Sequence, residues 1–107
     1  DGKWHDAIGF SAWVAKNASA KSNDVASMFQ VKAESLGLKG NRCVPSCKYW
    51  SANFYILKNT ACPAVLTENL FQDNKEDCEF LKTKKAKELI ADLHVDTIIE
   101  YINKYEK

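Results

Sequence analysis

Beyond Asn74 the chain contains neither glycine nor proline, which strongly constrains its fold. Apolar residues recur there at spacings of three and four, which predicts a long helix over about Lys84–Tyr105 after a short one around Lys75–Leu81. One face of the long helix is expected to carry Ile90, His94, Ile98, Tyr101 and Tyr105. Because Leu93 and Ile102 add apolar area elsewhere around this helix, we expect cover on more than one side.

The first part of the chain predicts a strand followed by a helix. Apolar and aromatic residues alternate over Ile8–Val14, the pattern of a half-buried strand. Ser22 is placed to cap a helix that runs on to Leu36, and Gly37 is placed to end it in the left-handed conformation. A strand, a helix and a glycine stop in this order indicate an α/β unit.

The middle of the chain is less regular. Lys39–Ala52 is expected to be mostly loop, because it mixes glycine, proline, serine and aromatic residues. Phe54–Leu57 and Ala64–Thr67 are short runs of strand-forming residues, and we expect them to be neighbouring strands. The fold class predicted is α/β, a partial sheet of about three to four strands with packed helices.

Composition narrows the functional classes. The 107 residues carry a net charge of +1 with acidic and basic residues interspersed, so no footprint for nucleic acid is expected. No apolar run approaches the roughly 20 residues of a membrane span. The expected organisation is a single domain over residues 1–107, one that is truncated rather than complete, since the chain opens abruptly at Asp1.

The chain has four cysteines, which could be free thiols, metal ligands or disulfide partners: Cys43, Cys47, Cys62 and Cys78. Their spacing does not match the paired spacing of zinc-binding motifs, so free thiols are favoured over a metal site. A disulfide between Cys43 and Cys47 in an oxidising compartment stays open.

A predicted apolar strand that begins after a proline is followed directly by a glutamate. Pro63 opens the run, Ala64–Thr67 continues it, and Glu68 follows. Ligands and catalysis tend to lie at the carboxyl ends of strands in α/β sheets. The local pattern alone nevertheless favours a solvated or structural Glu68 over a catalytic one.

The passage around Glu68 resembles the zinc-dependent N-acetylmuramoyl-L-alanine amidases of the type 3 family, in which such a strand ends in a catalytic glutamate. Residues that match the family's spacing after this glutamate are Phe71, Asn74, Asp77 and Leu81. Upstream and downstream matches in the family's order are Gly9, Phe10, Ser22 to Phe29, Arg42, Ile56, Leu57, Ile90, Ala91 and Ile98. The resemblance covers about Asp6 to Tyr105. Leu70 departs from it, because a glycine is common there.

The resemblance implies zinc as cofactor, but the family's ligands, two histidines and a glutamate, are expected in segments before Asp1. The chain is therefore expected to be the C-terminal part of a larger α/β amidase domain, with Glu68 as its catalytic residue and no metal ligand of its own. His5 is expected at the surface, and His94 as a hydrogen-bonded core residue. Weaker candidates for substrate contact are Arg42, Tyr49 and Asn69, while Trp4, Trp13 and Trp50 are expected to pack structurally.

The function that the resemblance implies is zinc-assisted hydrolysis of the amide between N-acetylmuramoyl and L-alanine in peptidoglycan, with Glu68 as general acid/base. Action on the cell wall implies a periplasmic or extracellular location. The chain alone is expected to be inactive, and either to self-associate through an exposed sheet edge or to be only marginally stable. One alternative is a non-catalytic peptidoglycan-binding module of the same fold. Another is a small α/β interaction domain whose likeness to the family is accidental.

Overall fold

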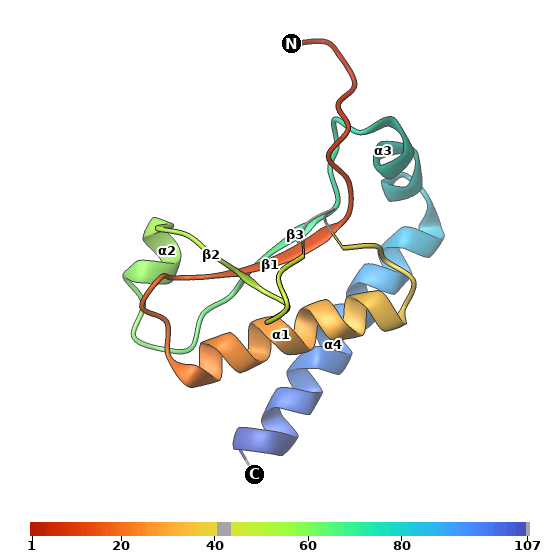
Figure 1. Cartoon of the computed structure of the whole chain (residues 1–107). Helices are drawn as coiled ribbons and strands as arrows, with labels where there is room; N and C mark the ends of the chain where they lie inside the picture. The colour runs from red at the N-terminus through yellow and green to blue at the C-terminus, as the bar shows by residue number, and fades with distance from the viewer. Residues whose placement is uncertain (41–43, 107) are drawn as a thin grey trace.

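The computed structural model describes residues 1–40 and 44–106. Its strands are β1 (Phe10–Val14), β2 (Trp50–Ser51) and β3 (Leu66–Asn69), and its helices are α1 (Ala20–Ser35), α2 (Tyr55–Lys58), α3 (Lys75–Leu81) and α4 (Lys84–Tyr105). Figure 1 shows α1 and α4 crossing on one side of the sheet, with α2 and α3 near its two ends. No helix among these described residues is long and apolar enough to cross a membrane.

The three strands form one mixed sheet in the order β2-β1-β3. The central strand β1 runs parallel to β2 and antiparallel to β3. In the second pairing Phe10 lies opposite Asn69, and Ser11 lies opposite Glu68. The predicted α/β class and partial sheet are confirmed, with the strand number at the lower end of the expected range.

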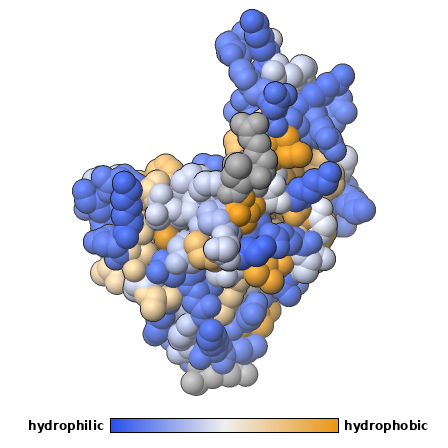
Figure 2. All heavy atoms as spheres, viewed as in Figure 1, coloured by the Kyte–Doolittle hydropathy of each residue, from blue (hydrophilic) through white to orange (hydrophobic). Residues whose placement is uncertain are grey.

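The core lies between the sheet and the two long helices. Alternate residues of β1, Phe10, Ala12 and Val14, are buried and belong to one hydrophobic cluster with residues of α1 and α4. From the helices, Phe29 and Leu93 join this cluster. Burying a side chain of this size stabilises the fold by about 1.5–3 kcal/mol. Hydrophobic residues gather toward the middle of the face seen in Figure 2, while hydrophilic ones cover its projecting ends.

The ends of α1 show one correct and one wrong prediction. Gly37 follows the helix with φ of +91°, the left-handed conformation expected of it. The N-cap, however, is Ser19 and not Ser22, and the backbone N–H of Ser22 donates to the hydroxyl of Ser19 at 3.2 Å. Two serines three positions apart satisfy the same sequence signal, and the helix uses the first.

The two C-terminal helices have the bounds predicted for them. Each begins at a side-chain cap, since Asn74 accepts from the N–H of Asp77 and Thr83 accepts from the N–H of Ala86. The lysines around the start of α4 are exposed: Lys82, Lys84, Lys85 and Lys87. The expectation that α4 is covered on more than one side is wrong for the part of the chain described, because Ile98 and Ile102 are exposed.

The predicted strand Phe54–Leu57 is wrong. Its residues cap and form α2, a single turn in which Leu57 is buried while Tyr55 and Ile56 are exposed. The segment is therefore not a neighbour of β3, whose partner is β1. Strand propensity depends on a pleated surface to pack against, and this turn lies beyond the edge of the sheet at the β2 end. The short strand β2 instead comes from Lys39–Ala52, predicted to be mostly loop.

A polar cluster joins the start of α1 to the end of α4. The side chains of Lys104 and Tyr105 both donate hydrogen bonds to the carboxylate of Asp24. The bond from Lys104, followed by that from Tyr105, holds the pKa of Asp24 below its usual value. The bond to Asp24 in turn raises the pKa of Tyr105.

Replacing Asp24 by asparagine is expected to lower stability at pH 7 by about 1 kcal/mol or less, since the cluster is partly exposed. A lowered pKa in the folded state means that the stabilisation is complete above about pH 4 and is lost as the pH falls below it. Thermal unfolding of both proteins at pH 7 and pH 3 measures this difference. Asp92→Asn on the exposed face of α4 is the control, and an equal loss at both pH values would contradict the assignment.

Candidate active site

Glu68 lies within β3, on the face of the sheet that turns away from the long helices. Its neighbours along the strand point the other way, and Thr67 bonds to His94 of α4 with 3.0 Å between Oγ1 and Nε2. Alternation along β1 places Ser11 and Trp13 on the same face as Glu68. The carboxylate is half-buried there.

Three side chains form a hydrogen-bonded chain on this face. The indole N–H of Trp13 donates to the hydroxyl of Ser11 at 2.9 Å, and this hydroxyl donates to Oε2 of Glu68 at 3.4 Å. Ser11 is fully buried in the centre of the sheet, so its hydroxyl has few orientations available. The contact is long for a hydrogen bond between oxygens, and it involves one oxygen of the Glu68 carboxylate.

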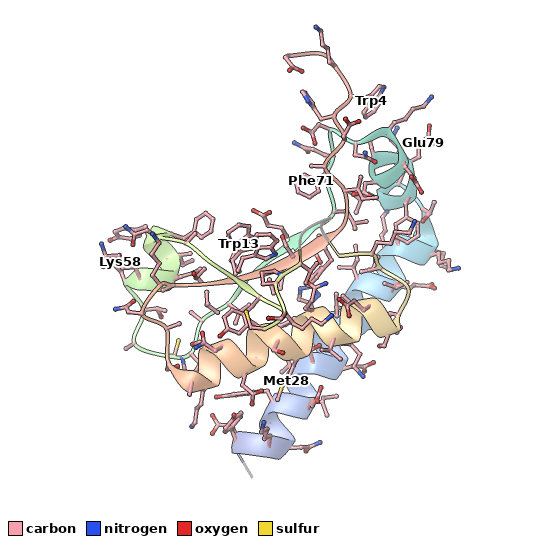
Figure 3. All side chains as sticks on the ribbon, in the orientation of Figure 1. Trp4, Trp13, Met28, Lys58, Phe71 and Glu79 are labelled. Carbon is pink, nitrogen blue, oxygen red and sulfur yellow. The ribbon has the colours of Figure 1, made fainter. Side chains whose placement is uncertain are left out.

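Aromatic rings continue this face toward β2. Trp13 stacks on Trp50 with ring centroids 5.6 Å apart, and the ring of Phe54 meets Trp13 edge-on at 5.8 Å. Figure 3 shows Trp13 on the side of the sheet away from α1. The structural packing expected of Trp13 and Trp50 is confirmed, whereas Trp4 is 58% exposed, so packing was the wrong expectation for it.

The chain turns sharply just after Glu68. Leu70 has φ of +75°, a conformation that glycine adopts more easily than leucine does. The carboxylate of Asp77 stabilises this turn by accepting from the N–H of Phe71 at 3.1 Å and from that of Gly9 at 2.9 Å. A hollow beside the turn is lined by residues from Glu68 to Asp73 and by Leu81.

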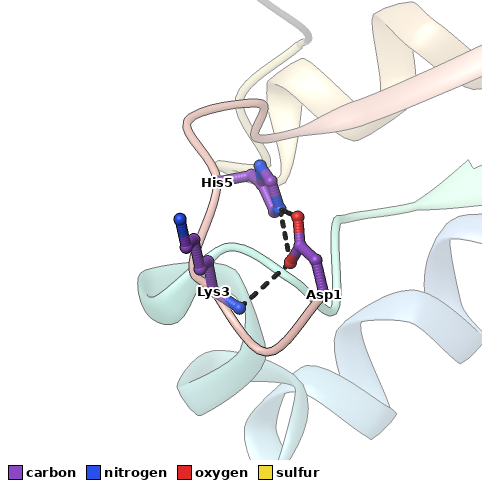
Figure 4. A network of polar contacts seen from close by, with 3 residues as sticks. All are labelled: Asp1, Lys3 and His5. Atoms are coloured by element: carbon purple, nitrogen blue, oxygen red, sulfur yellow. Dashed lines mark hydrogen bonds and ion pairs between the residues drawn. The ribbon is translucent and has the colours of Figure 1, made fainter.

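Neither histidine lies beside Glu68. His5 is exposed and pairs with the carboxylate of Asp1 at 3.0 Å, as Figure 4 shows. The other, His94, is held by the carbonyl of Ile90 at 2.8 Å and by Thr67, and its ring packs against Phe29. His5 is thus the surface residue and His94 the hydrogen-bonded residue that the sequence predicts.

The described residues do not fit a zinc site by themselves. Over residues 1–40 and 44–106, no three histidine, cysteine or acidic side chains come together in a way that could hold a metal ion. Cys62 and Cys78 are free thiols. Cys43, and with it the Cys43–Cys47 pairing left open by the sequence, lies outside the described residues.

The weaker candidates for substrate contact do not converge on Glu68. Arg42 lies outside the described residues, and Tyr49 packs against the hydrophobic core. Asn69 points to the helix side, where its amide donates to Thr67 at 3.3 Å. Ser11 and Trp13, which do contact or support Glu68, were missed, although a serine inside an apolar strand is a detectable signal.

Solved amidase structures share this fold. An N-acetylmuramoyl-L-alanine amidase from Clostridium difficile 630 matches 98% of the chain with a TM-score of 0.83 at 19% sequence identity. The catalytic domain of CwlV, an amidase of Bacillus (Paenibacillus) polymyxa, matches 96% with a TM-score of 0.76 at 23% identity. The fold is thus that of an α/β amidase domain, of which the chain spans 54% and 52% of the respective structures.

The sequence places the chain more narrowly. Residues 3–100 match the family described as N-acetylmuramoyl-L-alanine amidase, and the chain belongs to this family. An endolysin of Bacillus phage SPP1 is 42% identical over 57 residues, which are 53% of this chain and 21% of the endolysin. The amidase CwlM of Bacillus licheniformis is 43% identical over 53 residues, which are 50% of this chain and 21% of CwlM. Each alignment thus spans about a fifth of the length of these relatives.

Proposed function

We propose that this chain is the C-terminal part of a peptidoglycan hydrolase that cleaves the amide between N-acetylmuramoyl and L-alanine, with Glu68 as general acid/base. The proposal rests on the family match over residues 3–100. It is supported by the Glu68 carboxylate, which is oriented by Ser11 and keeps one oxygen free of hydrogen bonds within the described residues. Such an enzyme acts on the cell wall, in the periplasm or outside the cell.

In this proposal Glu68 moves one proton twice. Its carboxylate accepts a proton from the attacking water, whose oxygen bonds to the carbonyl carbon of the lactyl group. The same proton then passes to the nitrogen of L-alanine as the carbon–nitrogen bond breaks, which leaves a lactyl carboxylate and a free amine. General acid/base catalysis of this kind contributes about 10²–10⁴-fold to the rate.

Ser11 and Trp13 support this role by position. The hydroxyl of Ser11, which itself accepts from the indole of Trp13, donates to Oε2 of Glu68 at 3.4 Å and so favours one orientation of the carboxylate before substrate binds. In the described part of the chain, Ser11 is the single hydrogen-bonding partner of the Glu68 side chain. The carboxylate therefore keeps an oxygen free to accept a proton.

Zinc, when bound, supplies a polarised carbonyl and a water of lowered pKa in hydrolases of this chemistry. The resemblance implies that its ligands lie in segments before Asp1, and among the described residues no group of three possible ligands is found. The lack of such a group among the described residues also fits a second candidate function, that of a non-catalytic module of amidase-like fold that binds peptidoglycan.

The 107 residues alone are expected to bind zinc weakly and to release no alanine amino groups from purified peptidoglycan. The longer protein that its gene encodes is expected to do both, since the mechanism needs three metal ligands. Zinc titration and labelling of newly formed amino termini measure the two properties. Submicromolar zinc binding with cleavage by the short chain would refute the placement of the ligands, and a longer protein that binds peptidoglycan without cleaving it would favour the binding module.

A further inference from the structure

We infer that the aromatic side chains beside Glu68 bind the sugar ring of the N-acetylmuramoyl group. These side chains are Trp13 and Trp50, with Phe54 at their margin, and together they are called the aromatic platform. The assignment rests on the proposed function, because the amide that Glu68 would cleave is attached to this sugar. It adds the part of the substrate that the platform contacts.

The platform lies on the face of the sheet that carries Glu68. Trp13 is two residues along β1 from Ser11, which lies opposite Glu68. Trp50 of β2 pairs with Trp13 on the other side of β1. The long helices α1 and α4 lie on the opposite side of the sheet (Figure 1), and Figure 3 shows Trp13 on the side away from α1. Since two residues of a strand span about 7 Å, the platform begins a short step along the sheet from the candidate acid/base.

The rings of the platform order one another and remain partly accessible. Trp13 and Trp50 stack with ring centroids 5.6 Å apart and an angle of 25° between their planes, and the ring of Phe54 meets Trp13 edge-on. All three side chains are half-buried. Among the described residues the indole N–H of Trp50 has no hydrogen-bond acceptor, so ring contacts hold this side chain in place. The platform therefore offers aromatic surface whose orientation is set before a ligand binds.

A sugar ring suits a surface of this kind. Its two faces carry C–H groups that pack on aromatic rings, while its hydroxyl groups point outward from the edge and stay hydrated. Tryptophan combines a large apolar ring with tolerance of water at its margin, which makes it suited to such mixed ligands. In the proposed substrate the lactyl ether joins the scissile carbonyl to the sugar through a few bonds. A carbonyl held at Glu68 therefore keeps the sugar within reach of the platform.

A hollow on the other side of Glu68 indicates the direction in which the substrate lies. Trp13 is opposite Leu66 at the start of β3, whereas the hollow is lined by residues from Glu68 to Asp73 at its end. An amide placed at Glu68 has its lactyl sugar on one side and its stem peptide on the other. The polar residues Gln72 and Asp73 of the hollow suit a peptide. The aromatic side is therefore assigned to the sugar.

Two substrates test this assignment in the longer, zinc-loaded protein that the gene encodes. One is an N-acetylmuramoyl-L-alanyl peptide. The other is a lactoyl-L-alanyl peptide of the same sequence, which has the scissile amide without the sugar. Trp50→Leu is expected to lower kcat/KM about tenfold on the first and to leave it within about twofold on the second. An equal loss on both substrates, or no loss on either, would overturn the assignment.

Two further variants separate recognition of the sugar from a general effect on the fold. Trp50→Phe keeps an aromatic ring and breaks no hydrogen bond among the described residues, so it is expected to retain most of the activity on the muramoyl peptide. Trp4→Leu changes the exposed tryptophan near α3, labelled in Figure 3, and is expected to leave both substrates unaffected. A loss in Trp50→Phe as large as that in Trp50→Leu would contradict a role for the ring.

Tryptophan fluorescence gives a readout that depends neither on cleavage nor on the folding of the Trp50 variants. N-acetylmuramic acid is expected to change the emission of the unsubstituted longer protein in a saturable way, and lactate is not. The change is expected to persist in Trp4→Leu, because the responding rings are those of the platform. A missing response, or an equal one with lactate, would overturn the site. A protein that binds the sugar in this way but cleaves neither peptide would refute the proposed hydrolysis and leave the sugar site standing.

Discussion

Replacing Glu68 by glutamine in the longer, zinc-loaded protein is expected to lower kcat on peptidoglycan by about 10²-fold or more. Glutamine has nearly the same size and shape, and it can still accept the hydrogen bond from Ser11. It cannot accept a proton from water at neutral pH. The loss is therefore expected in kcat, with fold and zinc content retained.

Two controls separate this role from a general effect of removing charge. Glu79→Gln changes an exposed carboxylate on α3, labelled in Figure 3, and is expected to leave kcat unchanged. Ser11→Ala removes the donor to Glu68 without removing the proton acceptor, so its effect on kcat is expected to be smaller than that of Glu68→Gln. If folded, zinc-loaded Glu68→Gln hydrolyses peptidoglycan within a few-fold of the parent, Glu68 is not the acid/base residue.

Elements whose sequence signal is local could be predicted. The bounds of α3 and α4 follow from the caps Asn74 and Thr83 and from an uninterrupted helical period. The left-handed Gly37 follows from its place after an apolar helix. Each of these signals lies within a few residues of the feature it determines, so no knowledge of the tertiary structure is needed.

Features that depend on a distant partner could not be predicted in the same way. Phe54–Leu57 has the composition of a strand, but it pairs with no strand of the described structure, and it forms the helical turn α2. The strand β2 forms because Trp50 pairs with Trp13, which is remote in sequence. Propensity ranks the alternatives for such short segments, and tertiary pairing decides between them.

In the candidate site, too, local features could be predicted from the sequence and contacts between distant residues could not. Glu68 could be proposed from the sequence because strand, glutamate and following helix are adjacent there and resemble a family motif. Its partner Ser11 lies 57 positions away and is brought opposite by antiparallel pairing. The role of Asp77 as acceptor for Gly9 likewise spans 68 positions. Spacing along the chain predicts neither contact.

Asp77 provides the second large effect, this time on stability. Its carboxylate is 8% exposed and accepts hydrogen bonds from two backbone N–H groups, those of Gly9 and Phe71. Asp77→Ala leaves the buried N–H of Gly9 without a partner, which costs about 1–3 kcal/mol, and removes the part-buried bond from Phe71, worth about 0.5–1.5 kcal/mol. The free energy of unfolding is therefore expected to fall by about 2–4 kcal/mol, a large fraction of the stability of a small domain.

The neighbouring residue isolates the cause of this loss. Glu76 also lies in the first turn of α3 but is exposed. Glu76→Ala therefore removes the same favourable charge at the helix N-terminus, but leaves no backbone N–H without its hydrogen-bond acceptor. Urea unfolding of both variants is expected to separate them by about 2 kcal/mol or more. Asp77→Asn, which keeps one acceptor oxygen, is expected to lie between them. Because these bonds hold the turn that follows β3, the placement of Glu68 depends on them, and equal stability of Asp77→Ala and Glu76→Ala would show that they do not hold it.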